Sequence, residues 1–325
     1  MKKVSILILV LLLCFTITAC GNDTENPNDN DQTVKIGLLS IDDSLPFFVA
    51  EQEGLYDDLG VDVELIPFGS ALDKETALEA GEIDGDMTDL VVAGLLKKGG
   101  NDIKVVETAL GAEPIEGRFV LLASPNSGIT DVNQLKGETI AIGNNTIIQY
   151  ICDQICYING FTDDEIVTEN IPDLVLRMET LLSDGITAAI LPDPLATVAI
   201  NAGAIPLVDD TKISVDGQPV NLSQSVVIFT QDSIDAKGES IDLAMEAYRQ
   251  AKVLINENPD AYRDALKTFT SIPENLAATY AMPTYTPKVL PTAGEINSVF
   301  EWMFAKGLTD ELYDYNSIVD ETFVN

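Results

Sequence analysis

The chain has 325 residues, of which 46% are hydrophobic and 22% charged, a balance that supports a substantial buried core and excludes a disordered or collagen-like protein. It contains no histidine, which excludes Ser-His-Asp and Cys-His catalysis and every metal site that depends on imidazole ligands. Asp and Glu number 53 against 18 Lys and Arg, and a formal charge of −35 would repel nucleic acid. We therefore expect no nucleic-acid partner, no cofactor and no metal.

The N-terminus has the composition of a secretory signal. A lysine pair precedes an almost wholly apolar stretch at residues 4–17, which is shorter than the about 20 residues that a transmembrane helix needs. The stretch leads to Ala19-Cys20 and resembles the lipobox of bacterial lipoproteins. We expect a cleaved signal peptide at residues 1–19, a lipid on Cys20 and attachment to the extracytoplasmic face of the cell membrane. An uncleaved anchor with a chance cysteine is the alternative.

Residues 20–33 are polar and acidic, and this composition predicts a flexible tether. From residue 34 onward, apolar strands alternate with helices, which predicts a mainly parallel sheet with helices on both faces. The first predicted strands cover residues 34–39, 61–66, 83–87 and 103–110, and the helices between them cover 46–55, 72–80 and 90–97.

The pattern restarts after residue 117. Further strands are predicted at 118–123, 139–142, 187–191, 204–208 and 225–229, with helices at 130–135, 144–159, 172–183 and 195–202, a polar loop at 209–222, and helices at 240–256 and 294–305. We expect one lobe from residues 34–117 and 230–325 and a second from 118–229, whose end strands form a hinge. The fold class is therefore α/β with a cleft between two lobes, where ligands commonly bind.

Two cysteines lie inside the predicted second lobe. Cys152 and Cys156 stand four residues apart on a predicted helix and therefore share one face. They are either buried free thiols or a disulfide, although a disulfide would strain a regular helix. Two such ligands without histidine do not make a metal site.

Several sequence blocks resemble the nitrate/sulfonate/taurine (NitT/TauT) type of ABC-importer substrate-binding protein, including its relatives that bind thiamine precursors. The blocks are residues 45–50 (LPFFVA), 53–56 (EGLY), 60–64 (GVDVE), 80–85 (AGEIDG), 131–142 (DVNQLKGETIAI) and 185–194 (GITAAILPDP). The resemblance implies a periplasmic-binding-protein-like fold of type 2, with two α/β lobes joined by a two-strand hinge. It also implies a protein that closes on a small solute and delivers it to an ABC permease and its ATPase, and we expect it to be a monomer.

Ligands of parallel α/β sheets bind beyond the carboxyl ends of the strands, so the residues that follow each predicted strand are the candidates for ligand contact. The candidate ligand-binding residues are Asp42, Ser44, Leu45, Phe68, Ser70, Thr88, Asp89, Arg118, Asn144, Asn145, Thr146 and Asp193. Those near residues 42–44 and 144–146 have an alternative role as helix caps, although a helix N-terminus also binds anions. Arg118 either binds an anionic ligand or pairs with Glu113 or Glu116.

The predicted ligand loops contain Asp42, Asp43, Asp89 and Asp193 but few basic residues, which favours an amine-bearing, zwitterionic or neutral ring compound. We expect a receptor for a small polar solute (a sulfonate, an amine or a compound like a thiamine precursor) that performs no chemistry on it. Two alternatives stay open. One is a lipoprotein that senses a ligand without transport, and the other is an enzyme on the same fold, such as a menaquinone-pathway dehydratase.

Overall fold

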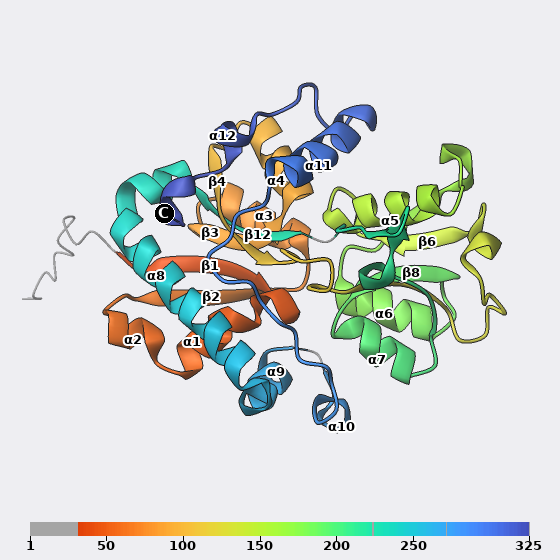
Figure 1. Ribbon diagram of the computed structural model, residues 1–325, viewed down its shortest axis with the longest axis horizontal. Coiled ribbons are helices and arrows are strands. Elements are labelled where there is room, and N and C mark those ends of the chain that lie inside the picture. Colours follow the sequence, from red (N-terminus) through yellow and green to blue (C-terminus); the bar gives the residue numbers. More distant parts are fainter. Residues whose placement is uncertain (1–31, 223, 271, 325) are drawn as a thin grey trace, which may run out of the picture. The chain divides into compact units, whose positions relative to one another are not determined.

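The structure is a computed structural model in which residues 32–222, 224–270 and 272–324 are described (Figure 1). The predicted signal peptide, the lipidation site Cys20 and most of the tether at 20–33 lie outside these residues. In the described part of the chain, no helix has the length and hydrophobicity that a membrane span requires.

The first sheet has five strands in the order β2-β1-β3-β12-β4. These are β1 (Val34–Leu39), β2 (Val63–Phe68), β3 (Gly85–Asp89), β4 (Ile103–Leu110) and β12 (Ser225–Thr230). The first three strands run parallel, whereas β12 is antiparallel to both of its neighbours. The helices of this first lobe are α1 (Leu45–Gln52), α2 (Leu55–Leu59), α3 (Ala71–Glu79), α4 (Leu90–Lys98) and α8 (Gln231–Glu257).

The second sheet also has five strands, in the order β7-β6-β8-β5-β9. These are β5 (Phe119–Ala123), β6 (Thr139–Ile142), β7 (Val167–Asn170), β8 (Ala188–Pro192) and β9 (Ile205–Asp209). The helices of this second lobe are α5 (Ile147–Ile158), α6 (Leu174–Leu182) and α7 (Leu195–Asn201). The two sheets with their helices confirm the predicted α/β class with two lobes.

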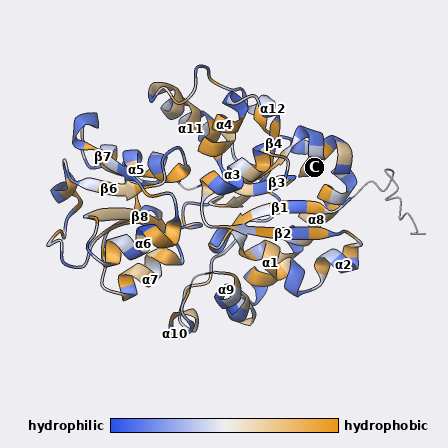
Figure 2. Cartoon of the chain, turned by 180° about the vertical axis from the view of Figure 1, so that it is seen from behind, coloured by the Kyte–Doolittle hydropathy of each residue, from blue (hydrophilic) through white to orange (hydrophobic). Residues whose placement is uncertain are grey.

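The C-terminal region returns to the first lobe. Its helices are α9 (Arg263–Phe269), α10 (Glu274–Ala277), α11 (Ala293–Ala305) and α12 (Tyr315–Ile318), and α11 packs on α4. Short 3-10 helices cover Asp42–Ser44, Val132–Leu135, Asp163–Glu165, Asp210–Lys212, Pro259–Tyr262 and Glu321–Phe323. The strands β10 (Ser214–Val215) and β11 (Gln218–Pro219) form a hairpin in the predicted polar loop. The helices α1, α6 and α7 each carry both hydrophobic and hydrophilic residues (Figure 2).

Some predicted elements differ from the observed ones for identifiable reasons. The predicted helix at 46–55 divides into α1 and α2 because Gly54 adopts a left-handed conformation with φ of 71°. The edge strand β7 has no predicted counterpart, since all four of its residues are exposed and give no apolar alternation. Cys152 and Cys156 are buried and free, so the free-thiol alternative holds and the disulfide does not.

The strand at 225–229 differs from its expected place. As a predicted hinge strand it belongs to the second lobe, but β12 lies between β3 and β4 of the first sheet and pairs with both. Its five residues from Ser225 to Phe229 are buried, as expected of a central strand. The chain therefore passes between the sheets in the segment after β4 and again in the segment before β12.

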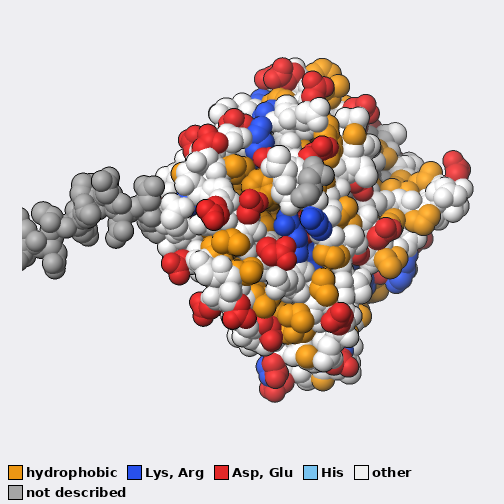
Figure 3. Space-filling model, turned by 60° about the vertical axis from the view of Figure 1, so that its left-hand side comes forward, with side chains coloured by type: hydrophobic (Ala, Val, Ile, Leu, Met, Phe, Trp, Pro, Cys, Tyr) orange, Lys and Arg blue, Asp and Glu red, His pale blue; other side chains and the backbone are white. Residues whose placement is uncertain are grey.

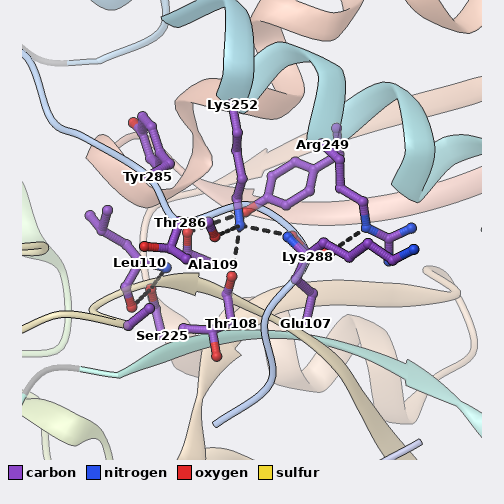
Figure 4. Close-up of polar contacts among 12 residues, drawn as sticks. Glu107, Thr108, Ala109, Leu110, Ser225, Arg249, Lys252, Tyr285, Thr286 and Lys288 are labelled. Carbon is purple, nitrogen blue, oxygen red and sulfur yellow. Dashed lines mark hydrogen bonds and ion pairs between the residues drawn. The ribbon is translucent and has the colours of Figure 1, made fainter. Parts of the chain in front are cut away.

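A buried charge cluster ties the C-terminal region to the first sheet (Figure 4). Glu107 of β4 accepts bonds from Arg249 Nε at 2.6 Å and Lys252 Nζ at 2.9 Å, both on α8, and from the backbone N–H of Lys288 at 3.0 Å. Lys252 also donates to the carbonyl of Thr108 at 2.7 Å. Burial lowers the pKa of Lys252, although Glu107 opposes the shift. The cluster fixes α8 and the segment around Lys288 on one strand.

The acidic surplus is spread over the surface. Figure 3 shows acidic side chains scattered across one face, between apolar and neutral ones, with a small group of basic side chains near its centre. A surface distributed in this way keeps the net charge high without one concentrated acidic patch on the face shown.

Candidate functional site

The main cavity has a volume of about 340 Å³ and is lined by strand ends and helix starts of both lobes. Its apolar wall includes Leu39, Ile41, Met87, Leu96, Phe119 and Leu174. Its polar lining includes Asp43, Lys74, Glu75, Thr88, Asp89, Asn144, Asn145, Thr146, Asn170, Arg177 and Ser225. Because the lining side chains come from both sheets, a molecule held here would touch both lobes.

Lys74 of α3 lies in the cavity wall and is fully buried. Its Nζ pairs with Glu75 Oε1 at 2.8 Å and with Asp86 Oδ2 at 3.0 Å, and Thr88 donates to the same Glu75 oxygen at 3.0 Å. Burial alone would lower the pKa of Lys74, but Asp86 and Glu75 raise it above its usual range. Lys74 is therefore a charged residue whose positive charge is already neutralised by two carboxylates.

Asp89 joins the two lobes at the cavity. It ends β3 and caps α4, where its Oδ1 accepts from the N–H groups of Val91 and Val92, each at 2.9 Å. The backbone N–H of Ile147, the first residue of α5 in the second lobe, also acts to lower the pKa of Asp89. Burial nevertheless raises this pKa to about 6. One carboxylate thus caps α4 and interacts electrostatically with the N-terminal end of α5 in the other lobe.

Asp43 presents an unpartnered oxygen beside the cavity. Its side chain is 7% exposed, and its Oδ1 has no hydrogen-bond partner among the described residues. Burial raises its pKa to about 7, while Ser225 and Lys74 oppose the shift. A buried carboxylate oxygen without a partner is costly, and the cost is removed when a ligand donates to it.

Arg177 of α6 supplies the second lobe's buried charge, with an exposed fraction of 1%. Its guanidinium donates to three backbone carbonyls, those of Ile171 at 2.8 Å, Ile190 at 3.1 Å and Pro172 at 3.4 Å. It forms no ion pair with any described carboxylate, and burial lowers its pKa to about 10. Its donors hold the end of β8 and the start of α6 together.

A second, small cavity of about 20 Å³ adjoins the segments that connect the lobes. Arg118 lines it and donates to Asp193 Oδ2 through Nη1 and to Asp209 Oδ2 through Nε, each at 2.9 Å. The alternative pairing of Arg118 with Glu113 or Glu116 is therefore not observed. Asp42 also lines this cavity and accepts a hydrogen bond from Tyr280.

The structure divides the predicted ligand residues into three groups. Thr88, Asp89, Asn144, Asn145 and Thr146 line the main cavity. Asp42, Arg118 and Asp193 line the small one. Ser44, Leu45, Phe68 and Ser70 line neither of the two: Ser44 and Leu45 are fully buried, Phe68 packs against the core, and Ser70 caps α3.

The predicted set omits Asp43, Lys74, Glu75, Phe119 and Arg177. A signal for Arg177 exists, since it follows Leu174 by three residues and precedes Leu181 by four, and this spacing places it on the buried face of its helix. A lysine such as Lys74 gives no such signal, because long basic side chains usually lie in solvent.

Among the described residues, no group of three or more Cys, Asp or Glu side chains is arranged to hold a metal ion. The lining of the main cavity offers hydrogen bonding, ion pairing and apolar contact, supplied by carboxylates, amides, hydroxyls, two basic side chains and a wall of aliphatic side chains.

Comparison with solved structures shows the same fold elsewhere. The ligand-binding component of an ABC-type import system from Staphylococcus aureus, solved with zinc bound, has a TM-score of 0.75 at 15% identity over 90% of this chain and 98% of that one. The periplasmic aliphatic sulphonate binding protein SsuA from Escherichia coli has a TM-score of 0.72 at 17% identity, over 88% of this chain and 97% of that one. The desulfurization enzyme DSZB has a TM-score of 0.65 at 13% identity, over 90% of this chain and 97% of that one.

The sequence comparisons give the family. No protein of curated function matches the chain. The family described as NMT1/THI5 like matches residues 42–262, which is most of the described chain and includes all residues that line the two cavities except Leu39 and Ile41. The match confirms the resemblance to the nitrate/sulfonate/taurine type of binding protein and the periplasmic-binding-protein-like fold. The chain belongs to the NMT1/THI5-like family.

Proposed function

We propose that this protein is an extracytoplasmic solute-binding lipoprotein, a monomer that captures a small polar solute and delivers it to an ABC permease and its ATPase. The observation that carries the proposal is the cavity of about 340 Å³ lined by both lobes, in which buried oxygens of Asp43 and Glu75 have no hydrogen-bond partner within the described part of the chain. Two fold neighbours, an import-system component and a sulphonate-binding protein, support the same role.

The mechanism is closure of the lobes on the solute. Contacts between the lobes involve α5: the N–H of Ile147 at its start acts on the carboxylate of Asp89, and Asp153 accepts from Trp302 and Lys306 of the C-terminal region. A solute that contacts both lobes lowers the free energy of the closed form by its differential affinity for that form. The permease then recognises the closed form.

The lipid on Cys20 and the tether at 20–33 would hold the binding lobes near the membrane and its permease. A lipid-anchored receptor gains effective concentration for its membrane partner, since encounter is confined to a surface. Mass spectrometry of the membrane-extracted protein tests this part: the expected N-terminal residue is an acylated Cys20, and a chain that retains residues 1–19 contradicts it.

An enzyme on this fold is the second candidate, because the desulfurization enzyme DSZB shares the fold at 13% identity. The chain offers no histidine for proton transfer, and its two described cysteines are buried thiols. We therefore propose binding without bond chemistry. Mass spectrometry of each bound solute after prolonged incubation separates the two, because an enzyme releases a changed molecule.

The decisive experiment is a solute screen on the full chain purified in detergent. Thermal unfolding is measured with sulfonates, amines, amino acids, pyrimidines and sugars, since a ligand at about 100 times its Kd adds about 2.7 kcal/mol to the free energy of unfolding. We expect one chemical class to raise the unfolding temperature. A lipoprotein that only senses would bind equally, so uptake of that solute by cells with and without the gene decides between sensing and transport. A screen in which no class binds contradicts solute capture.

A further inference from the structure

The walls of the main cavity are largely aliphatic. Leu39, Met87 and Leu96 of the first lobe face Phe119 and Leu174 of the second across it. A solute without apolar surface, such as nitrate or a sugar, would leave these walls in contact with water. The walls therefore favour an organic molecule with an apolar body, whose burial contributes roughly 25 cal/mol for each Å².

The charges in the cavity wall are unequally satisfied. Of the two basic groups, Lys74 pairs with two carboxylates, whereas Arg177 donates to three carbonyls and has no ion pair among the described residues. The unpartnered atoms are acceptors: Oδ1 of Asp43 and Oε2 of Glu75 are buried and have no hydrogen-bond partner among the described residues. The cavity consequently lacks donors for its own oxygens, and a ligand must supply them.

The position that would attract an anion is already filled. The N-terminal end of α5 carries the positive end of a helix dipole, and it borders the cavity through residues 144–148. The N–H groups of Asn144, Asn145 and Ile148 already donate to side-chain oxygens. The N–H of Ile147 acts on the carboxylate of Asp89, whose pKa it lowers. An anionic solute would have to displace Asp89 and would then lie beside Asp43 and Glu75.

We propose that the cavity binds an organic cation, a protonated amine on an apolar body, with its ammonium group donating to Asp43 and Glu75. The proposal rests on the solute-binding function and names the chemical class of the solute. Burial disfavours the ionised form of Asp43, whose pKa is about 7, and an ammonium group restores that form by supplying a donor and a positive charge. The aliphatic walls hold the rest of the molecule.

The test uses matched probes on one body. The probes of the first set share a phenyl ring and differ in their charged group: they are phenethylamine, 3-phenylpropanoate, 2-phenylethanesulfonate and phenylalanine. A second set carries the same charged groups on a cyclohexyl ring. Each is titrated calorimetrically into the full chain in detergent at pH 8. We expect the amines to bind and the carboxylates and sulfonates not to bind.

The outcomes separate the cation from the broader function. If the acids bind in preference to the amines, the proposal of a cationic solute is wrong, and the proposal of solute capture stands. If phenylalanine binds more tightly than phenethylamine, the cationic solute is also wrong, because Arg177 would then hold an acid group. If no probe of either set binds, the cationic solute is wrong, and solute capture is wrong as well only when the broader screen also fails.

Variants give a second readout. Asp43→Asn keeps the side-chain shape and removes the charge, so we expect the amine Kd to rise roughly tenfold or more. Asp57→Asn, on the exposed surface of α2, is the matched control and leaves the Kd unchanged. Glu75→Gln is the second variant and is expected to weaken the amine as well. An amine Kd within about twofold of the wild type in both cavity variants overturns the proposal.

Discussion

The indole Nε1 of Trp302 donates a hydrogen bond of 3.0 Å to Oδ2 of Asp153. Trp302 belongs to α11, which packs on the first lobe, and Asp153 belongs to α5 of the second, so this bond joins the lobes. Lys306 reinforces the contact with an ion pair of 2.9 Å to the same carboxylate oxygen. The ring of Trp302 also lies edge-on to Tyr150 at 5.4 Å between centroids.

Trp302 is the single tryptophan of the chain and is 7% exposed, so its fluorescence reports this contact. We expect Asp153→Ala to shift the emission to longer wavelength and to weaken solute binding severalfold, because the closed form loses a hydrogen bond and an ion pair outside the cavity. Asp164→Ala, on the exposed surface of the same lobe, is the control. An unchanged spectrum together with unchanged affinity would show that this contact does not stabilise the closed form.

Replacement of Glu107 tests the buried charge cluster. Glu107→Gln leaves Arg249 and Lys252 buried without a carboxylate, and we expect a loss of about 3–5 kcal/mol in the free energy of unfolding. Urea unfolding followed by circular dichroism measures the loss. Glu246→Gln, on the exposed side of α8, should change stability by less than about 0.5 kcal/mol. A similarly small change for Glu107→Gln contradicts a structural role of the cluster.

The stability of the protein should fall as pH rises from about 4 to about 7. Burial raises the pKa of Asp43 to about 7 and that of Asp89 to about 6, from 3.8 in the unfolded chain, so the folded state binds protons more tightly over this interval. The stabilisation is complete below pH 4 and is lost as pH passes the folded-state pKa values. Urea unfolding at pH 4.5 and pH 8 measures it, and Asp43→Asn should flatten the profile. A wild-type stability that increases over this interval would contradict the assignment.

Gly85 occupies a position that admits no side chain. A Cβ atom there would collide with the carbonyl oxygen of Ile228 and the ring of Phe229 on the neighbouring strand. We expect Gly85→Ala to lower the unfolding temperature by several degrees, because β3 must move away from β12. Gly238→Ala is the control, since nothing lies within 4 Å of its Cβ position, and it should be neutral or stabilising. Equal unfolding temperatures for the two variants would exclude the clash.

Much of the fold was predictable because apolar residues recur with strand and helix spacing along most of the chain. Two elements could not be predicted in this way, each for a physical reason. β7 is exposed along its whole length, so it carries no burial signal. The pairing of β12 with β3 and β4 depends on where the chain returns, which local spacing does not encode.

The candidate site was predictable where strand ends define it, as at Thr88, Asp89 and residues 144–146. The prediction failed where the helix after a strand turns a side chain inward, as with Leu45 in the core and Lys74 in the cavity wall. Such orientations depend on packing between distant segments. Asp43 lines both cavities, whereas its neighbour Asp42 lines only the small one, and no sequence pattern contains this distinction.

The insertion of β12 between β3 and β4 also sets an order of assembly during synthesis. The second sheet is complete once residues 119–209 have emerged, because one continuous stretch supplies all of its strands. The first sheet must wait for residues 225–230, and until then β3 and β4 each have an unpaired edge. The lobe whose strands come first in the chain is therefore the last to complete its sheet.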